Sequence, residues 1–403
     1  MLIKVLAYFI PLAINFLNGG FFFITSYRFA QAGCPGVVVG GALATWGVVY
    51  CAVSILIGRI ARKSNILPLI FTGSLLLVVS AAGFMIFDGL YTQFLWLVVS
   101  GCGGASFCTP FQLLAKEIES GNGTSGAVSA TAFYTMTWSI GFATGPLAFA
   151  GLSVRQGFAV TLLLALAVNL SVTGIVLLTR DRRRDAGTAP AEALPQRTVP
   201  AGTRFSTASF TKLALLGWLV GGMGSITICQ VRSMWPKLGS ELAVPQHHVA
   251  YILALVSYVQ AVTALSLCRS REWMWRRIPA VLVALCGIAA LLLFAFGKTI
   301  GSFYAAAAIY GVYSGCFFFH LVYHSLAHPE RSAFFVSGNE VIVGVTSLLF
   351  PLLGGWLADR FGGAPAAFIF GAAVTLIALI GQLIILGTIP EEEKVLREEN
   401  PSA

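Results

Sequence analysis

Charged residues are scarce in this sequence. Asp, Glu, Lys and Arg make up only 10% of its 403 residues, whereas soluble domains carry roughly 25%. Apolar residues make up 57% of the chain, which leaves too little polar surface to cover the folded protein in water. The composition therefore excludes an ordinary water-soluble domain and predicts a membrane protein, part of whose surface is in contact with lipid.

Sequence motifs for covalent or nucleotide chemistry are also missing. The chain has eight cysteines but no Cys-x-x-Cys pair, and most of these cysteines lie within apolar runs, so neither disulfides nor a metal site is expected. It has no phosphate-binding Gly-x-x-x-x-Gly-Lys loop and no Gly-x-Ser-x-Gly motif. We therefore expect no cofactor, no catalytic residues and no ATP-driven transport by this chain alone.

The net charge of +9 is spread in a pattern that argues against nucleic acid as a partner. Basic residues occur in short clusters between apolar runs, for example at positions 59–63, 180–184 and 269–277. A nucleic-acid-binding protein would instead gather them on one face. Short basic clusters between apolar runs are typical of the cytoplasmic loops of membrane proteins.

Long apolar runs dominate the rest of the chain. A membrane-spanning helix needs about 20 mainly apolar residues. The sequence has twelve such stretches, at 5–28, 36–57, 66–87, 91–115, 126–150, 156–179, 210–233, 246–268, 277–297, 301–323, 332–356 and 364–389. The first is too long for the core of a cleaved signal peptide, so we interpret it as an uncleaved helix.

The Lys and Arg residues predict the orientation of these helices. With the N-terminus in the cytoplasm, 19 of the 25 basic residues fall in cytoplasmic segments. The six that fall outside are Arg28, Arg155, Arg232, Lys237, Lys298 and Arg360. Because cytoplasmic loops carry an excess of Lys and Arg, this bias predicts twelve helices with both termini inside, in a bacterial inner membrane.

The longest hydrophilic segment divides the chain into two halves. We predict an N-terminal six-helix bundle over 1–179, a cytoplasmic linker over 180–208, a C-terminal six-helix bundle over 209–390 and an acidic tail over 391–403. The halves share features at one spacing. Gly-Gly and Ile-Thr pairs recur 202 residues apart, and Pro146 and Pro351 are 205 apart. Such repeats indicate a duplicated six-helix unit.

Two motifs within this architecture resemble those of the major facilitator superfamily. Residues 138–146 follow the pattern Trp-Ser-x-Gly-x-x-x-Gly-Pro, and residues 355–362 follow Gly-x-Leu-Ala-Asp-Arg-x-Gly. The resemblance covers nearly the whole chain and implies an all-α fold of two pseudo-symmetric six-helix bundles. One departure is Arg62, which lies in the loop between the second and third stretches where the family has an acidic residue.

The resemblance also implies a function. It predicts a monomeric secondary transporter, with protons and a small-molecule substrate as partners, in which the two halves rock around a site near the midplane. Within that class, proton-coupled import of a small polar solute is favoured over a proton-driven exporter, because the N-terminal half has no acid at membrane depth. A transport-inactive receptor is the second alternative, and the altered loop at Arg62 supports it.

Glu340 is the one acidic residue predicted at membrane depth. It lies about eight residues into the stretch 332–356, or roughly 12 Å along a helix. Ionisable groups at such depth are costly and usually functional, and removal from water favours the neutral form of a carboxyl. We predict that Glu340 couples transport to protons, with helix packing as the alternative. The antiparallel stretch 301–323 places His320 at a comparable depth, so we also predict a proton-exchanging contact between His320 and Glu340.

His320, His324 and His328 share one helix face. Histidines at i and i+4 can hold a metal, which leaves a membrane enzyme as a third class of function. No cluster of Asp or Cys completes such a site, and we favour a solvated helix end with no metal bound.

Amide and aromatic side chains at membrane depth suit hydrogen bonding and stacking with a solute, although any one of them can equally serve helix packing. The predicted substrate-binding residues are Asn15, Asn18, Arg28, Gln112, Tyr134, Trp138, Gln230, Tyr258, Gln260, Tyr310, Tyr313 and Asn339, and about half of the amides and aromatics are expected to face a central cavity.

Arg28 and Arg232 lie at equivalent places near the outer ends of two helices. In related organic-anion transporters, paired arginines at these places hold the substrate. The alternative is that the side chains of Arg28 and Arg232 reach the lipid headgroups, and we favour this alternative. Gly145, Pro146 and Pro351 are predicted gating residues that bend their helices.

Overall fold

A computed structural model describes residues 2–61, 65–87, 89–119, 125–185, 207–269, 272–328 and 331–390. Every regular element in these ranges is helical. The α-helices are α1 (Leu2–Gln31), α2 (Gly36–Ile60), α3 (Ile66–Ile86), α4 (Gln93–Glu119), α5 (Ser125–Gly151), α6 (Val154–Asp185), α7 (Thr207–Glu241), α8 (Gln246–Leu267), α9 (Arg277–Phe296), α10 (Ile300–Ala327), α11 (Ser332–Arg360) and α12 (Pro365–Gly387). A short 3-10 helix, η2 (Glu272–Trp275), precedes α9. The predicted all-α class with twelve helices is confirmed.

Helices α6 and α7 extend furthest beyond their predicted stretches. Helix α6 continues through Asp185, into the predicted linker, and α7 continues past position 233 to Glu241. In the extra turns of α7, Trp235 and Leu238 are buried, and Lys237 and Glu241 form an i,i+4 ion pair of 3.0 Å. A polar helix end that carries such a pair is stable beyond the apolar run that the sequence displays. The rest of the linker (186–206), Arg62 and the tail over 391–403 lie outside the described residues.

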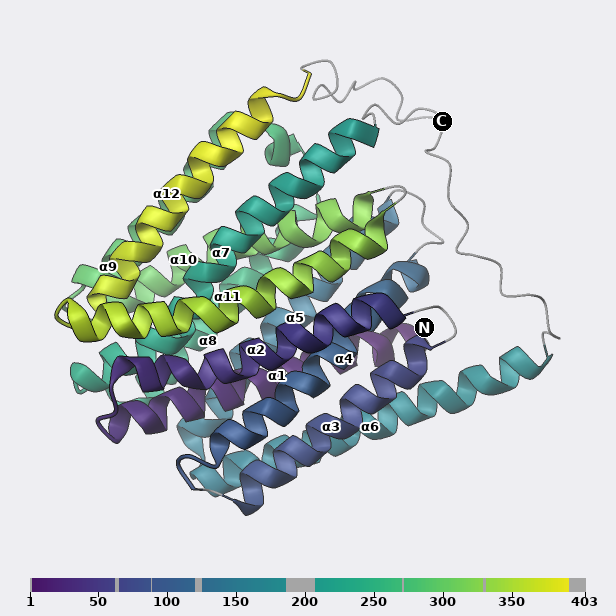
Figure 1. Ribbon diagram of the computed structural model, residues 1–403, viewed down its shortest axis with the longest axis horizontal. Coiled ribbons are helices and arrows are strands. Elements are labelled where there is room, and N and C mark those ends of the chain that lie inside the picture. The colour runs from purple at the N-terminus through teal and green to yellow at the C-terminus, as the bar shows by residue number, and fades with distance from the viewer. Residues whose placement is uncertain are drawn as a thin grey trace.

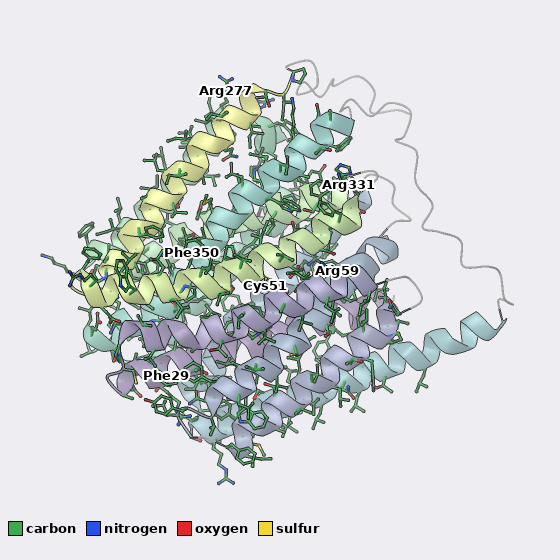
Figure 2. The ribbon with its side chains drawn as sticks, viewed as in Figure 1. Phe29, Cys51, Arg59, Arg277, Arg331 and Phe350 are labelled. Carbon is green, nitrogen blue, oxygen red and sulfur yellow. The ribbon has the colours of Figure 1, made fainter. Side chains whose placement is uncertain are left out.

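The two six-helix halves lie one above the other in Figure 1, with α1 to α6 running from purple through blue to teal and α7 to α12 from teal through green to yellow. Helices α2 and α11 run side by side along their boundary, and α5 packs against α8 across the same boundary. Helix α1 begins and α12 ends at the same end of the bundle. Arg59, Arg277 and Arg331 also lie towards that end (Figure 2). The site between the halves is thus built from helices of both.

Small residues allow α2 and α11 to approach closely. A Cβ atom on Gly36 would lie 2.7 Å from the carbonyl oxygen of Gly355, and one on Gly40 would overlap the carbonyl of Pro351. Close backbone approach of this kind is how helices associate in lipid. At the end of the bundle opposite the termini, the amides of Gly36 and Val37 donate to the carboxylate of Asp359 at 2.7 and 3.0 Å. Asp359 therefore caps the positive N-terminal end of a helix from the other half.

The outer faces of the bundle fit a lipid environment. Large apolar side chains such as Leu170 and Ile384 are 71% and 63% exposed. Among the described helices, eleven are long and apolar enough to cross a membrane, and α5 falls outside this set. Helix α5 is rich in hydroxyls, which bond back to carbonyls of its own preceding turn, as Thr137 does to Phe133 at 2.8 Å. Such bonds satisfy the hydroxyls without water, so a polar helix fits inside a multi-pass membrane protein.

Candidate functional site

Glu340 lies on α11 in the second half, but its hydrogen bonds come from the first half. The Tyr50 hydroxyl of α2 donates to one carboxylate oxygen, and the Gln112 amide of α4 donates to the other. The same Gln112 nitrogen lies 3.4 Å from the hydroxyl of Tyr134 on α5. Glu340 is only 6% exposed. A buried carboxylate is tolerable only when its oxygens are bonded, and here the bonding groups join the two halves.

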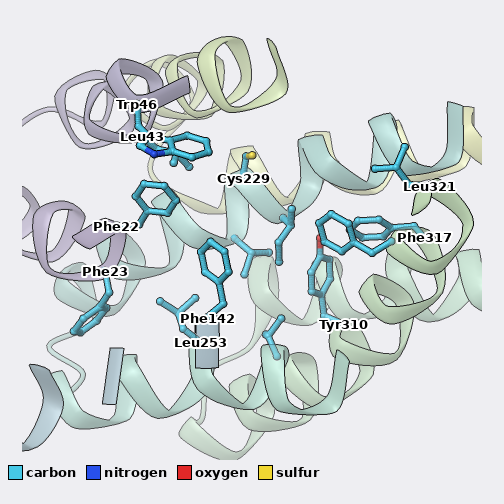
Figure 3. Packing of buried hydrophobic residues seen from close by; sticks show 14 of the residues in the cluster. Phe22, Phe23, Leu43, Trp46, Phe142, Cys229, Leu253, Tyr310, Phe317 and Leu321 are labelled. Carbon is cyan, nitrogen blue, oxygen red and sulfur yellow. The ribbon is translucent and has the colours of Figure 1, made fainter. Parts of the chain in front are cut away.

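These residues line a cavity of about 70 Å³ between the halves. Its lining residues come from seven helices: Asn15, Asn18, Phe22, Leu43, Trp46, Tyr50, Cys108, Gln112, Tyr134, Thr135, Trp138, Phe142, Cys229, Arg232, Phe318, Leu321, Val322, Asn339, Glu340, Val343 and Ser347. Figure 3 shows Phe22, Trp46 and Phe142 of the first half gathered close to Cys229 of α7. A buried water needs at least about 10–15 Å³, so the cavity has room for a few waters or a small solute.

Arg232 on α7 reaches this cavity from the second half. Its guanidinium carbon lies 3.9 Å from the ring centre of Phe142 and 5.3 Å from that of Trp138, both on α5. One of its terminal nitrogens, Nη2, is buried and has no hydrogen-bond partner. A cation over aromatic faces is attracted by their electron-rich surfaces, but that attraction does not give Nη2 a hydrogen-bond acceptor.

The interpretation of Arg232 as a headgroup contact is wrong, because the predicted helix ended too early. The stretch 210–233 placed Arg232 at the membrane surface. Since α7 continues to Glu241, Arg232 lies nine residues before the end of the helix. At about 1.5 Å per residue, this places it roughly 13 Å from that end along the helix axis. The i,i+4 charges at Lys237 and Glu241 were the available signal for this extension.

The structure brings together six of the eleven predicted amide and aromatic residues at the cavity: Asn15, Asn18, Gln112, Tyr134, Trp138 and Asn339. Asn15 and Asn18 have partners within the first half. Asn15 donates to the carbonyl of Pro11 at 2.8 Å, and Ser100 donates to the side-chain oxygen of Asn18 at 3.4 Å. Trp46, Tyr50, Cys108 and Thr135 also line the cavity, and we did not predict them, since nothing in the sequence separates them from other residues of apolar helices.

The other five lie away from this cavity. Gln260 donates to Ser139 at 2.6 Å, which joins α8 to α5. Tyr310 bonds Thr227 at 2.6 Å, and Tyr313 lies 3.4 Å from Thr375. Gln230 is fully buried and faces Gly371 of α12, and Tyr258 is 36% exposed on the outer surface of α8. Arg28 is not among the lining residues either.

The predicted contact between His320 and Glu340 is not formed. His320 lies against Trp273 of η2, with ring centres 4.8 Å apart, and lines a separate cavity of about 20 Å³ within the second half. Its ring centre is 5.3 Å from that of His324, whereas His328 bonds Thr211 at 3.2 Å. Depth along a helix does not determine rotation about its axis, and α10 turns His320 away from α11. In the described part of the chain, no three His, Cys, Asp or Glu side chains form a metal-binding group.

The predicted gating residues lie where helices meet. A Cβ on Gly145 would overlap the backbone of α1 near Phe16, and the carbonyl of Pro351 faces Gly40 of α2. Pro146 lines a small cavity next to Arg232. Helices α5 and α11 are continuous through these prolines. Their role in gating stays a prediction.

Solved structures with the same fold are transporters. The human organic anion transporter MFSD10 matches with a TM-score of 0.66 and 13% identity, over 93% of this chain and 98% of that one. The nucleoside transporter NupG matches with a TM-score of 0.63 and 14% identity, over 97% and 100%. FucP, a major facilitator superfamily transporter in the outward conformation, matches with a TM-score of 0.59 and 14% identity, over 95% and 98%. The chain therefore has the major facilitator fold, as the motifs implied.

No family model matches the sequence, and neither does any curated protein. Identities of 12–14% to the solved structures are compatible with a shared fold and with many different solutes. The site itself must therefore supply the argument for function.

Proposed function

We propose that this protein is a secondary transporter that moves a small polar organic solute across the membrane by alternating access, coupled to protons at Glu340. The observation that carries the proposal is the position of Glu340. It is a buried carboxyl in the cavity between the halves, it belongs to one half, and its bonds come from Tyr50 and Gln112 of the other half. Ionisable residues inside membrane proteins are costly and are usually retained for function.

The hydrogen bonds suggest how a proton would act. Both Tyr50 and Gln112 donate, so they suit an ionised Glu340, and hydrogen bonds to an ionised group are roughly twice as strong as neutral ones. When Glu340 takes up a proton, one of its oxygens becomes a donor, and the attachment to α2 and α4 weakens. Proton uptake would then release one half from the other. The titratable groups that share this cavity with Glu340 are Tyr50, Cys108, Tyr134, Cys229 and Arg232.

The test is transport into proteoliposomes that carry the full-length protein. A panel of labelled hexoses, nucleosides, amino acids and carboxylates is offered under an inward proton gradient. For any accumulated solute, Glu340→Gln is expected to abolish accumulation, because the amide cannot release a proton, while solute exchange without a gradient continues. The matched control is Glu241→Gln, which removes an acid that is 38% exposed and paired with Lys237, and it is expected to accumulate solute as the wild type does.

Other outcomes would count against the proposal at different points. Equal accumulation by Glu340→Gln and the wild type would make Glu340 a packing residue, and another ion would have to drive transport. If no solute in the panel moves in either protein, the transport-inactive receptor becomes the better reading. An exporter would accumulate solute only when the proton gradient is reversed.

A further inference from the structure

Arg232 is a cation in the central cavity that the protein itself does not neutralise. No acidic side chain of the described residues is paired with it, and its Nη2 atom is buried without an acceptor. The neighbours at its guanidinium are the rings of Phe142 and Trp138. Because an unpaired buried charge is unfavourable, a group that supplies a negative charge and acceptor oxygens would bind here strongly.

Glu340 does not fill that role. Both of its oxygens accept hydrogen bonds from Tyr50 and Gln112, on α2 and α4, and no ion pair joins it to Arg232. Arg232 and Glu340 are the only Lys, Arg, Asp or Glu residues among the described residues that line the cavity. The anion that fits Arg232 must therefore come from outside the chain.

The remaining lining describes the rest of such a ligand. Phe22, Trp46, Trp138, Phe142 and Phe318 present aromatic surface to the cavity, together with several aliphatic side chains. The volume of about 70 Å³ admits only a compact molecule. A ligand with one anionic group and a small apolar or planar body would match both the cation and these walls.

We infer that the transported solute is a small monocarboxylate, whose carboxylate is held by the guanidinium of Arg232 while its apolar body lies against the aromatic side chains of α1, α2 and α5. The inference rests on the proposed transport function and names its substrate class. A planar guanidinium offers two parallel N–H donors that match the two oxygens of a carboxylate. A doubly charged phosphate is a poorer match, because the described lining has no second cation to balance it.

Charge balance connects this ligand to Glu340. In the empty cavity, the charges of Arg232 and an ionised Glu340 sum to zero. When a monocarboxylate binds to Arg232, the cavity contents stay neutral only if Glu340 takes up a proton. In a region of low dielectric constant, a set of charges that sums to zero costs less free energy than a net charge does. One proton would then enter with each anion, and the transport cycle would move no net charge.

The test measures binding to the purified full-length protein in detergent, using benzoate and lactate as probes and their uncharged amides, benzamide and lactamide, as matched partners. In the wild type, at least one acid is expected to bind about tenfold or more tightly than its amide, since the amide cannot pair with the guanidinium. Arg232→Gln is expected to remove this difference. Arg155→Gln, which removes an exposed arginine at the start of α6, is expected to keep it.

If Arg232→Gln does not fold, the comparison of acid with amide in the wild type remains decisive. In that case Arg232→Lys reports whether the positive charge alone retains the preference for the acid over its amide. Equal binding of acids and amides would overturn the inference, and so would binding of neither acid. An unchanged preference in Arg232→Gln would also overturn it. Accumulation of a neutral hexose or nucleoside that depends on Glu340 would leave the proposed transport function standing while this inference fails.

Discussion

Asn339 and Glu340 are neighbours on α11, yet their side chains meet different groups. Glu340 is bonded by the first half, whereas Asn339 joins three helices of the second half. The indole nitrogen of Trp218 and the hydroxyl of Ser325 donate to its oxygen at 2.9 and 2.8 Å, and its amide donates to the carbonyl of Leu321 at 3.2 Å. With these bonds made, Asn339 has little capacity left for a solute, although it borders the cavity.

Asn339→Ala is therefore expected to lower stability rather than solute affinity. The substitution removes three hydrogen bonds, two of them buried, and leaves Ser325 without its acceptor. This loss should cost about 1–3 kcal/mol of unfolding free energy. Thermal unfolding of the purified protein in detergent measures this loss. Asn15→Ala is the matched control, because the side-chain amide of Asn15 donates to the carbonyl of Pro11 in its own helix, and the substitution should cost less than about 1 kcal/mol. Normal stability with weakened solute binding in Asn339→Ala would assign the residue to the substrate site.

Among the helices, the pair α2 and α11 sets the distance between the halves at the cavity. Glu340 meets Tyr50 within this pair, and Gly344 packs on the backbone of Cys51 one turn further along α11. A larger side chain at such a crossing must displace a whole helix, because backbone atoms cannot rotate aside. The hydrogen bond between Tyr50 and Glu340 depends on this close approach.

Two adjacent glycines of α2 allow a direct test. A methyl group at Gly40 would overlap the carbonyl of Pro351, whereas one at Gly41 would lie 3.9 Å from the ring of Phe94, an ordinary contact. Gly40→Ala is expected to destabilise the protein by about 1–3 kcal/mol through overpacking. Gly41→Ala should be neutral or slightly stabilising, since alanine favours the helix by about 1 kcal/mol. Thermal unfolding midpoints of the two variants in the same detergent give the comparison, and equal midpoints would mean that α2 and α11 are less tightly apposed in the folded protein.

At the scale of the whole molecule, the two halves touch along the full length of α2 and α11. Asp359 caps α2 at one end of this contact. Near the other end, a Cβ on Gly58 would lie 3.1 Å from the Cβ of Ser337. We therefore expect access to the cavity from the side of the chain termini to require separation of the ends of α2 and α11.

A disulfide at this position is expected to prevent that separation. The Cβ atoms of disulfide-bonded cysteines lie about 3.5–4.5 Å apart, so the double variant Gly58→Cys, Ser337→Cys should form a bond after mild oxidation with only a small shift. Solute uptake into proteoliposomes should then fall to background and recover after reduction. Each single variant serves as a control that should be insensitive to oxidation. Full uptake with the bond formed would show that α2 and α11 need not part at this point.

Hydropathy predicted the helices well because it varies along the chain, and a membrane span depends mainly on a continuous apolar run. The same reasoning identified Glu340, since an acid within such a run stands out without any knowledge of its neighbours. It failed at Arg232, where polar turns extend α7 beyond its apolar run. Helix ends are less certain than helix cores when charges can pair along a helix that leaves the membrane.

The sequence by itself therefore determined the number of helices, their division into two halves and the presence of Glu340 within a long apolar helix. Only the tertiary structure decided which polar residues face the cavity, that His320 turns towards Trp273, and that Tyr50 and Gln112 of one half bond Glu340 of the other. The physical reason is that these helices are apolar on most faces, since lipid and protein interior are both nonpolar. The inward face of such a helix is not marked by periodicity, and its rotation is settled by close packing against helices far away in the sequence.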